Sequence, residues 1–204
     1  MTNLKQGAMF GLDARIALAI FGALSVISGA ALYSAIEKAK MTQVLSEMEE
    51  FGKAWSAYYL DTGENLKPYD PSNPADHDYY IRRAIDLKND PGVSGWKGPY
   101  LSLDDFSTYS LQDSTKRWFI IMADSDAWST TGFQNHMCTT GVKCAVYTYF
   151  AYATEDKRTL AKALDEYIDG GDGDKAGKFR YDYNSSGPST RLHLKVSPIK
   201  NPND

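Results

Sequence analysis

The sequence has little of what most enzymes and nucleic-acid-binding proteins need. Its 204 residues carry 22 basic and 26 acidic side chains, so the net charge is −4 and no basic field would attract nucleic acid. The chain contains no G-x-S-x-G, H-E-x-x-H or phosphate-binding glycine motif. It has only three histidines, none spaced to share a metal with another: His77, His136 and His193. We therefore expect neither an enzyme nor a nucleic-acid partner, and a membrane-tethered hydrolase is the enzymatic alternative.

Charge is also absent from residues 16–36, IALAIFGALSVISGAALYSAI. A helix of these 21 residues is long enough to cross a hydrocarbon core of about 30 Å. The segment before it, MTNLKQGA, is too short and too polar to be a secretory signal with its own apolar core. The sequence therefore predicts a single-pass membrane helix near the N-terminus, with the lipid bilayer as a partner.

After this apolar segment the helical pattern continues but becomes amphipathic. Apolar residues recur at intervals of three and four, as on one face of a helix: Val44, Met48, Phe51, Trp55 and Tyr58. Gly63 suits a left-handed cap, so the helix should end near residues 61–63. The amphipathic part is expected to pack on a globular domain with its aromatic face.

The remainder of the chain alternates short apolar runs with turn-rich segments. We expect a loop over 67–78, a short helix over 79–87 and turns over 89–101. A second helix is predicted over 159–168, a loose tail from Ser197, and strands over 118–122, 145–153, 179–183 and 192–196. The predicted fold class is α+β, with a long N-terminal α-helix packed on a small antiparallel β-sheet.

Two cysteines, Cys138 and Cys144, lie in the segment CTTGVKC. If this part of the chain lies outside the cytoplasm, they should form a disulfide that closes a small loop. The alternatives are a pair of thiols or half of a metal site. His136 is the one nearby histidine, and a structural zinc site needs four ligands.

The N-terminal segment resembles type IV pilins and type II secretion pseudopilins. In these families a prepilin peptidase cuts after a small residue and methylates the new N-terminal amine. A carboxylate at the fifth mature position and a glycine near the fourteenth are typical. Placing Gly22 at that glycine puts the cut after Ala8, the methylated amine on Met9 and the carboxylate at Asp13.

The segment departs from the family pattern at three places. Ala8 stands where glycine is usual, and Asp13 where glutamate is the rule. The proline common in the middle of the family's helix is replaced by Ser28-Gly29-Ala30. Cleavage after Gly7 or Gly11 is an alternative, but it would move Asp13 away from the fifth position.

A second resemblance, to the major pseudopilin, lies downstream. It is carried by LSEMEEFGKAWSAYYLDTG, residues 45–63, and by WKGPYL, residues 96–101. We expect Trp96 and Tyr100 to hold a Gly-Pro turn against the helix. The resemblance implies a leader over 1–8, a membrane and filament-core helix over 9–36, an amphipathic stalk helix over 37–63 and an extracytoplasmic head over 64–204.

The carboxylate in the membrane segment has a physical rationale. An unpaired carboxylate inside a bilayer costs several kcal/mol, and the N-terminal amine of a neighbouring subunit could neutralise Asp13. Small residues on the same helix would allow close approach of neighbouring helices: Gly22, Ser25, Ser28 and Gly29. An ordinary membrane boundary, marked by Asp13 and Arg15, is the alternative interpretation.

Acidic residues on a glycine-rich segment provide the candidate metal site, Asp169, Asp172 and Asp174. Carboxylates that repel one another can be brought together by Ca²⁺, which prefers oxygen ligands, and the family resemblance also implies calcium. The spacing does not match an EF-hand loop, and a solvated acidic turn is the alternative. A second acidic pair, Asp124 and Asp126, is a weaker candidate.

The resemblance implies a structural subunit that polymerises with copies of itself into a helical filament. A type II secretion pseudopilus is the first expectation and a surface type IV pilus the alternative. The implied partners are a prepilin peptidase, an inner-membrane assembly platform and minor pilins or pseudopilins. The chain would be anchored in the inner membrane before assembly into a periplasmic or cell-surface filament. A membrane-anchored binding protein is the alternative of a different class.

Overall fold

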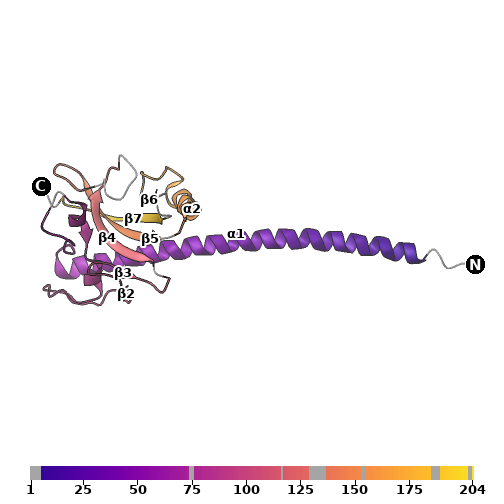
Figure 1. The fold of residues 1–204 in the computed structure, drawn as a ribbon, viewed down its shortest axis with the longest axis horizontal. Coiled ribbons are helices and arrows are strands. Elements are labelled where there is room, and N and C mark those ends of the chain that lie inside the picture. Colours follow the sequence, from indigo (N-terminus) through magenta and orange to yellow (C-terminus); the bar gives the residue numbers. More distant parts are fainter. Residues whose placement is uncertain are drawn as a thin grey trace, which may run out of the picture. The chain divides into compact units, whose positions relative to one another are not determined.

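The computed structural model describes residues 6–73, 76–115, 117–128, 137–152, 155–184, 189–201 and 204. Residues 1–5 of the expected leader and His136 lie outside the described residues. The chain divides into two compact units, Met1–Gln43 and Val44–Asp204. Every strand of the described residues lies in the second unit, and Figure 1 labels most of them.

A single helix, α1 (Gln6–Thr62), runs through 57 residues. It ends where the sequence predicts, because Gly63 takes a left-handed conformation with φ of 73° and donates its N–H to the Tyr59 carbonyl at 2.9 Å. Residues 11–36 are almost all exposed, whereas one face of residues 44–62 is buried. The helix is therefore uniform in backbone conformation but not in environment.

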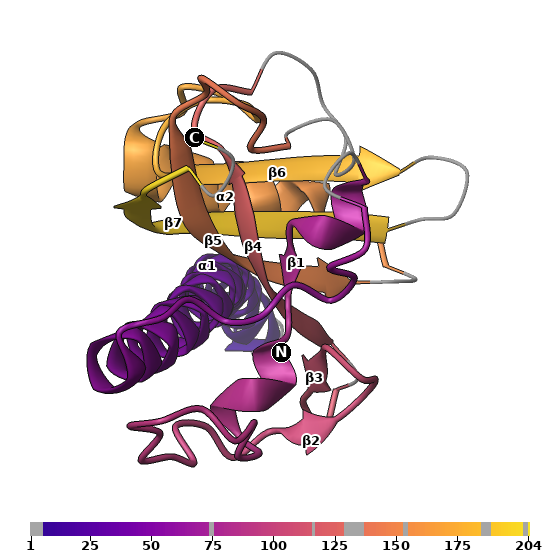
Figure 2. The same ribbon diagram turned by 90° about the vertical axis from the view of Figure 1, so that its left-hand side faces the viewer.

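Among the described residues, seven strands form one sheet in which all pairs are antiparallel. Their order is β2-β3-β4-β5-β7-β6, and β1 pairs with β4. Figure 2 shows β4, β5, β7 and β6 in succession. The bounds are β1 Ile81–Arg82, β2 Asp104–Asp105, β3 Leu111–Gln112, β4 Trp118–Ser125, β5 Cys144–Tyr152, β6 Phe179–Asn184 and β7 Ser189–Ile199.

The second part of α1 packs on the sheet through aromatic contacts. The ring of Phe51 lies 5.7 Å from that of Phe119 on β4 and 6.3 Å from that of Phe150 on β5, in edge-to-face arrangements. Gly52 allows a close approach to β7, since an added Cβ would lie 3.1 Å from a methyl group of Val196. The α+β prediction is confirmed: an N-terminal helix packs against an antiparallel sheet.

The second helix, α2 (Arg158–Asp169), is close to the predicted range of 159–168 and contacts β6 and β7. It turns Ala161 and Leu164 inward, and both are fully buried. Its C-terminus is capped by Gly170 in a left-handed conformation. The cap leads directly into the glycine-rich segment before β6.

Two predictions of local structure were wrong. The helix expected over 79–87 is instead the 3-10 turn η1 (His77–Tyr79), β1 and the 3-10 turn η2 (Ala84–Leu87). The backbone N–H groups of Arg83 and Ala84 donate to the carbonyls of Lys67 and Tyr109, which are remote in sequence. These N–H groups are therefore not available for the i to i−4 hydrogen bonds of an α-helix. The tail is not loose from Ser197 either, because β7 continues to Ile199.

Candidate functional site

The first part of α1 exposes large apolar side chains. Leu18 and Phe21 are each 70% exposed and Val26 is 73% exposed. Among the described residues, α1 is the helix long and apolar enough to cross a membrane by length and composition. It could therefore serve as a membrane anchor or as a signal sequence, since both share these properties.

The residues expected to act in processing and assembly all lie on this part of α1. Ala8 and Met9 belong to the helix, and Asp13 is exposed on its next turn. Open space surrounds Gly22, where an added Cβ would meet no atom within 4 Å. Cleavage after Ala8 and pairing of Asp13 with a neighbouring amine stay predictions.

The WKGPYL segment contacts the end of α1, as predicted for Tyr100. The Tyr100 hydroxyl donates to Asp61 Oδ2 at 2.9 Å, and Lys97 Nζ donates to Asp61 Oδ1 at 2.8 Å. These two hydrogen bonds lower the pKa of the Asp61 carboxyl. The ring of Tyr100 also lies 6.1 Å from that of Tyr58 on the buried face of the helix.

The same segment is anchored to η2 on its other side. Trp96 Nε1 donates to the Asp86 carbonyl at 3.1 Å, and the rings of Trp96 and Tyr100 meet edge to face. Gly95 has φ of 86°, and an added Cβ would collide with the carbonyl of Asp61. The turn therefore fits against the helix end only with glycine at this position.

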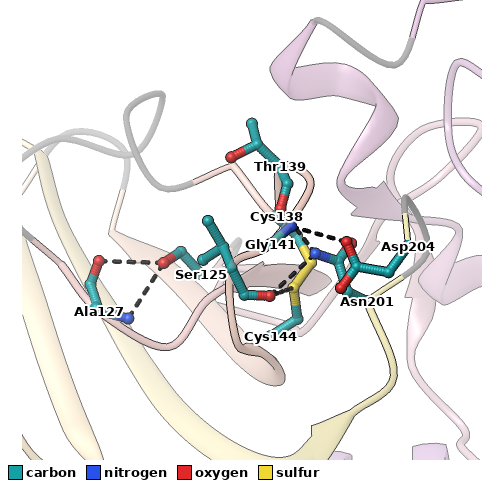
Figure 3. Close-up of a disulfide and its surroundings, with 9 residues drawn as sticks. Ser125, Ala127, Cys138, Thr139, Gly141, Cys144, Asn201 and Asp204 are labelled. Atoms are coloured by element: carbon teal, nitrogen blue, oxygen red, sulfur yellow. Dashed lines mark hydrogen bonds between the residues drawn. A yellow bond between two sulfur atoms is a disulfide. The ribbon is translucent and has the colours of Figure 1, made fainter.

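The disulfide between Cys138 and Cys144 is present, with the two Cα atoms 5.7 Å apart (Figure 3). The loop that this disulfide closes also forms hydrogen bonds with the C-terminal segment. Asn201 Nδ2 donates to the carbonyls of Thr139 and Val142 at 2.7 and 3.0 Å. The Gly141 N–H donates to Asp204 Oδ1 at 2.7 Å.

The structure assembles an acidic group at the end of α2, but with one member changed. Asp165, Asp169 and Asp172 each offer a carboxylate oxygen, and these oxygens lie within 4.8 Å of one another. Asp174, predicted as the third ligand, is not part of this group. Asp165 takes its place because it lies one helical turn before Asp169, on the same face of α2.

Backbone groups of the glycine-rich segment fit closely around the acidic group. The N–H of Gly173 donates to Asp165 Oδ2 at 3.2 Å, and that of Phe179 donates to Asp169 Oδ2 at 2.6 Å. An added Cβ at Gly177 would lie 2.5 Å from Asp169 Oδ2 and 2.8 Å from Asp172 Oδ2. Two of the carboxylates therefore converge on a position that only glycine leaves open.

The electrostatic effect of bringing the three carboxylates together is clearest at Asp165. It is 5% exposed, and among the described residues its Oδ1 has no hydrogen-bond partner. Burial raises the pKa of its carboxyl, and the charges of Asp172, Asp169 and Glu166 raise it further, against the Gly173 hydrogen bond. A hard divalent cation would relieve both the repulsion and the unpaired oxygen, so these residues fit Ca²⁺.

The second acidic pair is engaged by basic residues instead. Asp124 is 2% exposed, and burial raises the pKa of its carboxyl well above the usual range against the charges of Arg82 and Arg180. Asp126 Oδ1 accepts a hydrogen bond from Lys195 Nζ at 2.6 Å. Among the described residues, neither belongs to a group of acidic side chains close enough to hold a metal.

No protein-family model matches this chain, and neither the curated proteins nor the solved structures yield a match. The likeness to pilins and pseudopilins therefore rests on the N-terminal motifs and on the architecture. A long apolar N-terminal helix whose later part packs on an antiparallel sheet is a pilin-like architecture.

Proposed function

We propose that the protein is a structural subunit of a pilin-like helical filament, a type II secretion pseudopilus in the first instance. The observation that carries the proposal is one helix with two environments. Its second part is buried on the chain's own sheet, while apolar side chains of its first part, such as Leu18 and Val26, stay exposed. That first part needs lipid before assembly and neighbouring helices after it.

Asp13 supports assembly rather than simple anchoring. It follows the polar residues 1–8 and lies at the start of the exposed apolar part of α1. A carboxylate at this depth favours a cationic partner, and a neighbour's processed N-terminal amine would supply one. An anchor that only holds a head at the membrane has no such need.

Intact-mass analysis of the protein from its own membrane tests processing. We expect loss of residues 1–8 and one added methyl group on Met9. An unprocessed chain, or one cut elsewhere without methylation, would favour a membrane-anchored binding protein. Electron microscopy of sheared cells and of periplasmic extracts would then separate a surface type IV pilus from a pseudopilus.

We further propose that the head binds Ca²⁺ through Asp165, Asp169 and Asp172. The support is the convergence of three carboxylates, the buried unpaired oxygen of Asp165 and the close fit of Gly177. The ion would tie the end of α2 to the start of β6. Its role would be structural, because it would hold two elements of the head together.

A further inference from the structure

The two flanks of α1 within the head differ in charge. Each flank borders a groove between the helix and the remainder of the head, one of about 190 Å³ and one of about 280 Å³. The smaller is called the acidic groove and the larger the basic groove, after their charged side chains. Both are formed entirely by residues of the unit Val44–Asp204.

The acidic groove contains three carboxylates and one arginine: Glu47, Glu50, Asp113 and Arg117. Arg117 forms ion pairs with both Glu47 and Asp113, and its side chain is only 10% exposed. Glu50 is exposed at the rim. The groove therefore presents net negative charge over an apolar floor that includes Phe51 and Phe119.

The basic groove contains three lysines and one carboxylate: Lys53, Lys178, Lys195 and Glu49. Lys195 is held by Asp126, whereas Lys53 and Lys178 are exposed and have no ion partner among the described residues. Its floor is also apolar, with Met48, Leu194 and Val196. The two grooves thus match in character and are opposite in sign.

We infer that the acidic groove of one copy docks against the basic groove of a second copy, and this inference rests on the proposed function. Because the two surfaces are different, the contact is heterologous and leaves one free groove at each end of any open assembly. Such contacts propagate into open helical arrays wherever the rotation between successive copies does not close a ring. Opposite charges would set which faces meet, and the apolar floors would provide the buried area.

Charge reversal in the full-length protein, expressed in its own membrane system, tests this docking. Glu50→Lys removes the net charge of the acidic groove and brings a cation towards the lysines of the basic groove, and Lys53→Glu with Lys178→Glu makes both grooves acidic, so each change should lower the filament yield about tenfold. The three substitutions combined in one chain should restore part of the yield, because the reversed side chains again face charges of opposite sign. Lys162→Glu, on an exposed part of α2 outside both grooves, is the matched control and should assemble normally.

The outcomes separate the docking from the filament proposal. Normal filaments from Glu50→Lys, or no recovery in the combined variant, would overturn the docking of the two grooves while leaving the filament role standing. A processed wild-type chain that forms no filament under any condition would overturn the proposed function itself. A second readout is salt, since assembly of the wild type should weaken as ionic strength screens the facing charges.

Discussion

Residues 11–43 and 44–62 of α1 have the same helical backbone but opposite relations to the protein around them. Leu18 and Val26 in the first part are 70% and 73% exposed, whereas Met48 and Tyr58 in the second are fully buried. The second part has its partner in the same chain, the sheet of the head. The large apolar side chains of the first part are exposed, and under the proposed function lipid or other subunits would cover them.

This difference shows how one helix can serve two kinds of packing. Burial of a large apolar side chain is favourable by about 1.5–3 kcal/mol, and in the second part this burial stabilises the folded head. Under the proposed function, burial of the first part would instead stabilise membrane insertion and filament assembly. Substitutions in the first part should therefore affect insertion and assembly, and substitutions in the second part should affect the stability of the head.

The largest effect is expected at Asp13. Asp13→Ala removes the carboxylate that would pair with a neighbour's amine, so it should leave membrane insertion and head stability unchanged but abolish or strongly weaken filament assembly. Asp13→Glu keeps the charge and should be tolerated. Filament yield, membrane fractionation and denaturant unfolding measure assembly, insertion and head stability, and normal filaments from Asp13→Ala would refute the pairing.

The next effect separates the two parts of the helix directly. Phe51→Ala should lower the free energy of unfolding of the head by about 3–5 kcal/mol, because it leaves a cavity beside the paired rings of Phe119 and Phe150. Phe21→Ala, at a position 70% exposed, is the matched control and should change it by less than about 0.5 kcal/mol. Denaturant unfolding of the full chain in detergent provides the measurement. Equal losses from both variants would contradict the contrast.

Adding or chelating Ca²⁺ tests whether an ion stabilises the folded head. The full chain should melt several degrees higher in millimolar Ca²⁺ than in chelator, since a ligand at 100 times its Kd stabilises by about 2.7 kcal/mol. Asp172→Ala should remove the difference, because it deletes one of the converging carboxylates. Asp174→Ala should keep it, because Asp174 lies outside the group. Identical melting curves with and without calcium would mean that this segment is a solvated acidic turn and not a calcium site.

The smallest effect is a pH dependence confined to the head. His193 is fully buried, and its Nε2 lies 3.2 Å from Asp182 Oδ2. Burial lowers the pKa of His193, with the charges of Arg191 and Arg180 acting in the same direction and Asp182 opposing them. The unfolded chain therefore takes up a proton first as the pH falls below about 6.5, and stability falls with it.

The slope attributable to this proton is at most about 1.4 kcal/mol per pH unit. His193→Gln should flatten the stability curve between pH 6.5 and the lower folded-state pKa, as measured by denaturant unfolding at a series of pH values. The buried carboxyls of Asp124 and Asp165 act with the opposite sign, because their raised pKa values favour the folded state on acidification towards about 3.8. An unchanged slope in His193→Gln would assign the pH dependence to other groups.

The sequence by itself determined the course of α1, its end near Gly63, the disulfide partners and the positions of the four longest strands. These are local properties. An uncharged run, a spacing of three and four, two cysteines six positions apart and short apolar runs between turns each limit what the backbone can do nearby. The contact of WKGPYL with the helix end was predictable as well, through its resemblance to the major pseudopilin.

Only the tertiary structure decided which residues meet across long separations. Asp172 meets Asp165 and Asp169 because the glycine-rich segment folds back over the end of α2, a path that sequence spacing does not reveal, whereas the spacing of Asp165 and Asp169 on one helix face could have been recognised. The segment 79–87 became strand and 3-10 turns because carbonyls of Lys67 and Tyr109 accept its hydrogen bonds. In both regions the deciding partners are brought close by the fold, whereas periodicity reports only on neighbours along the chain.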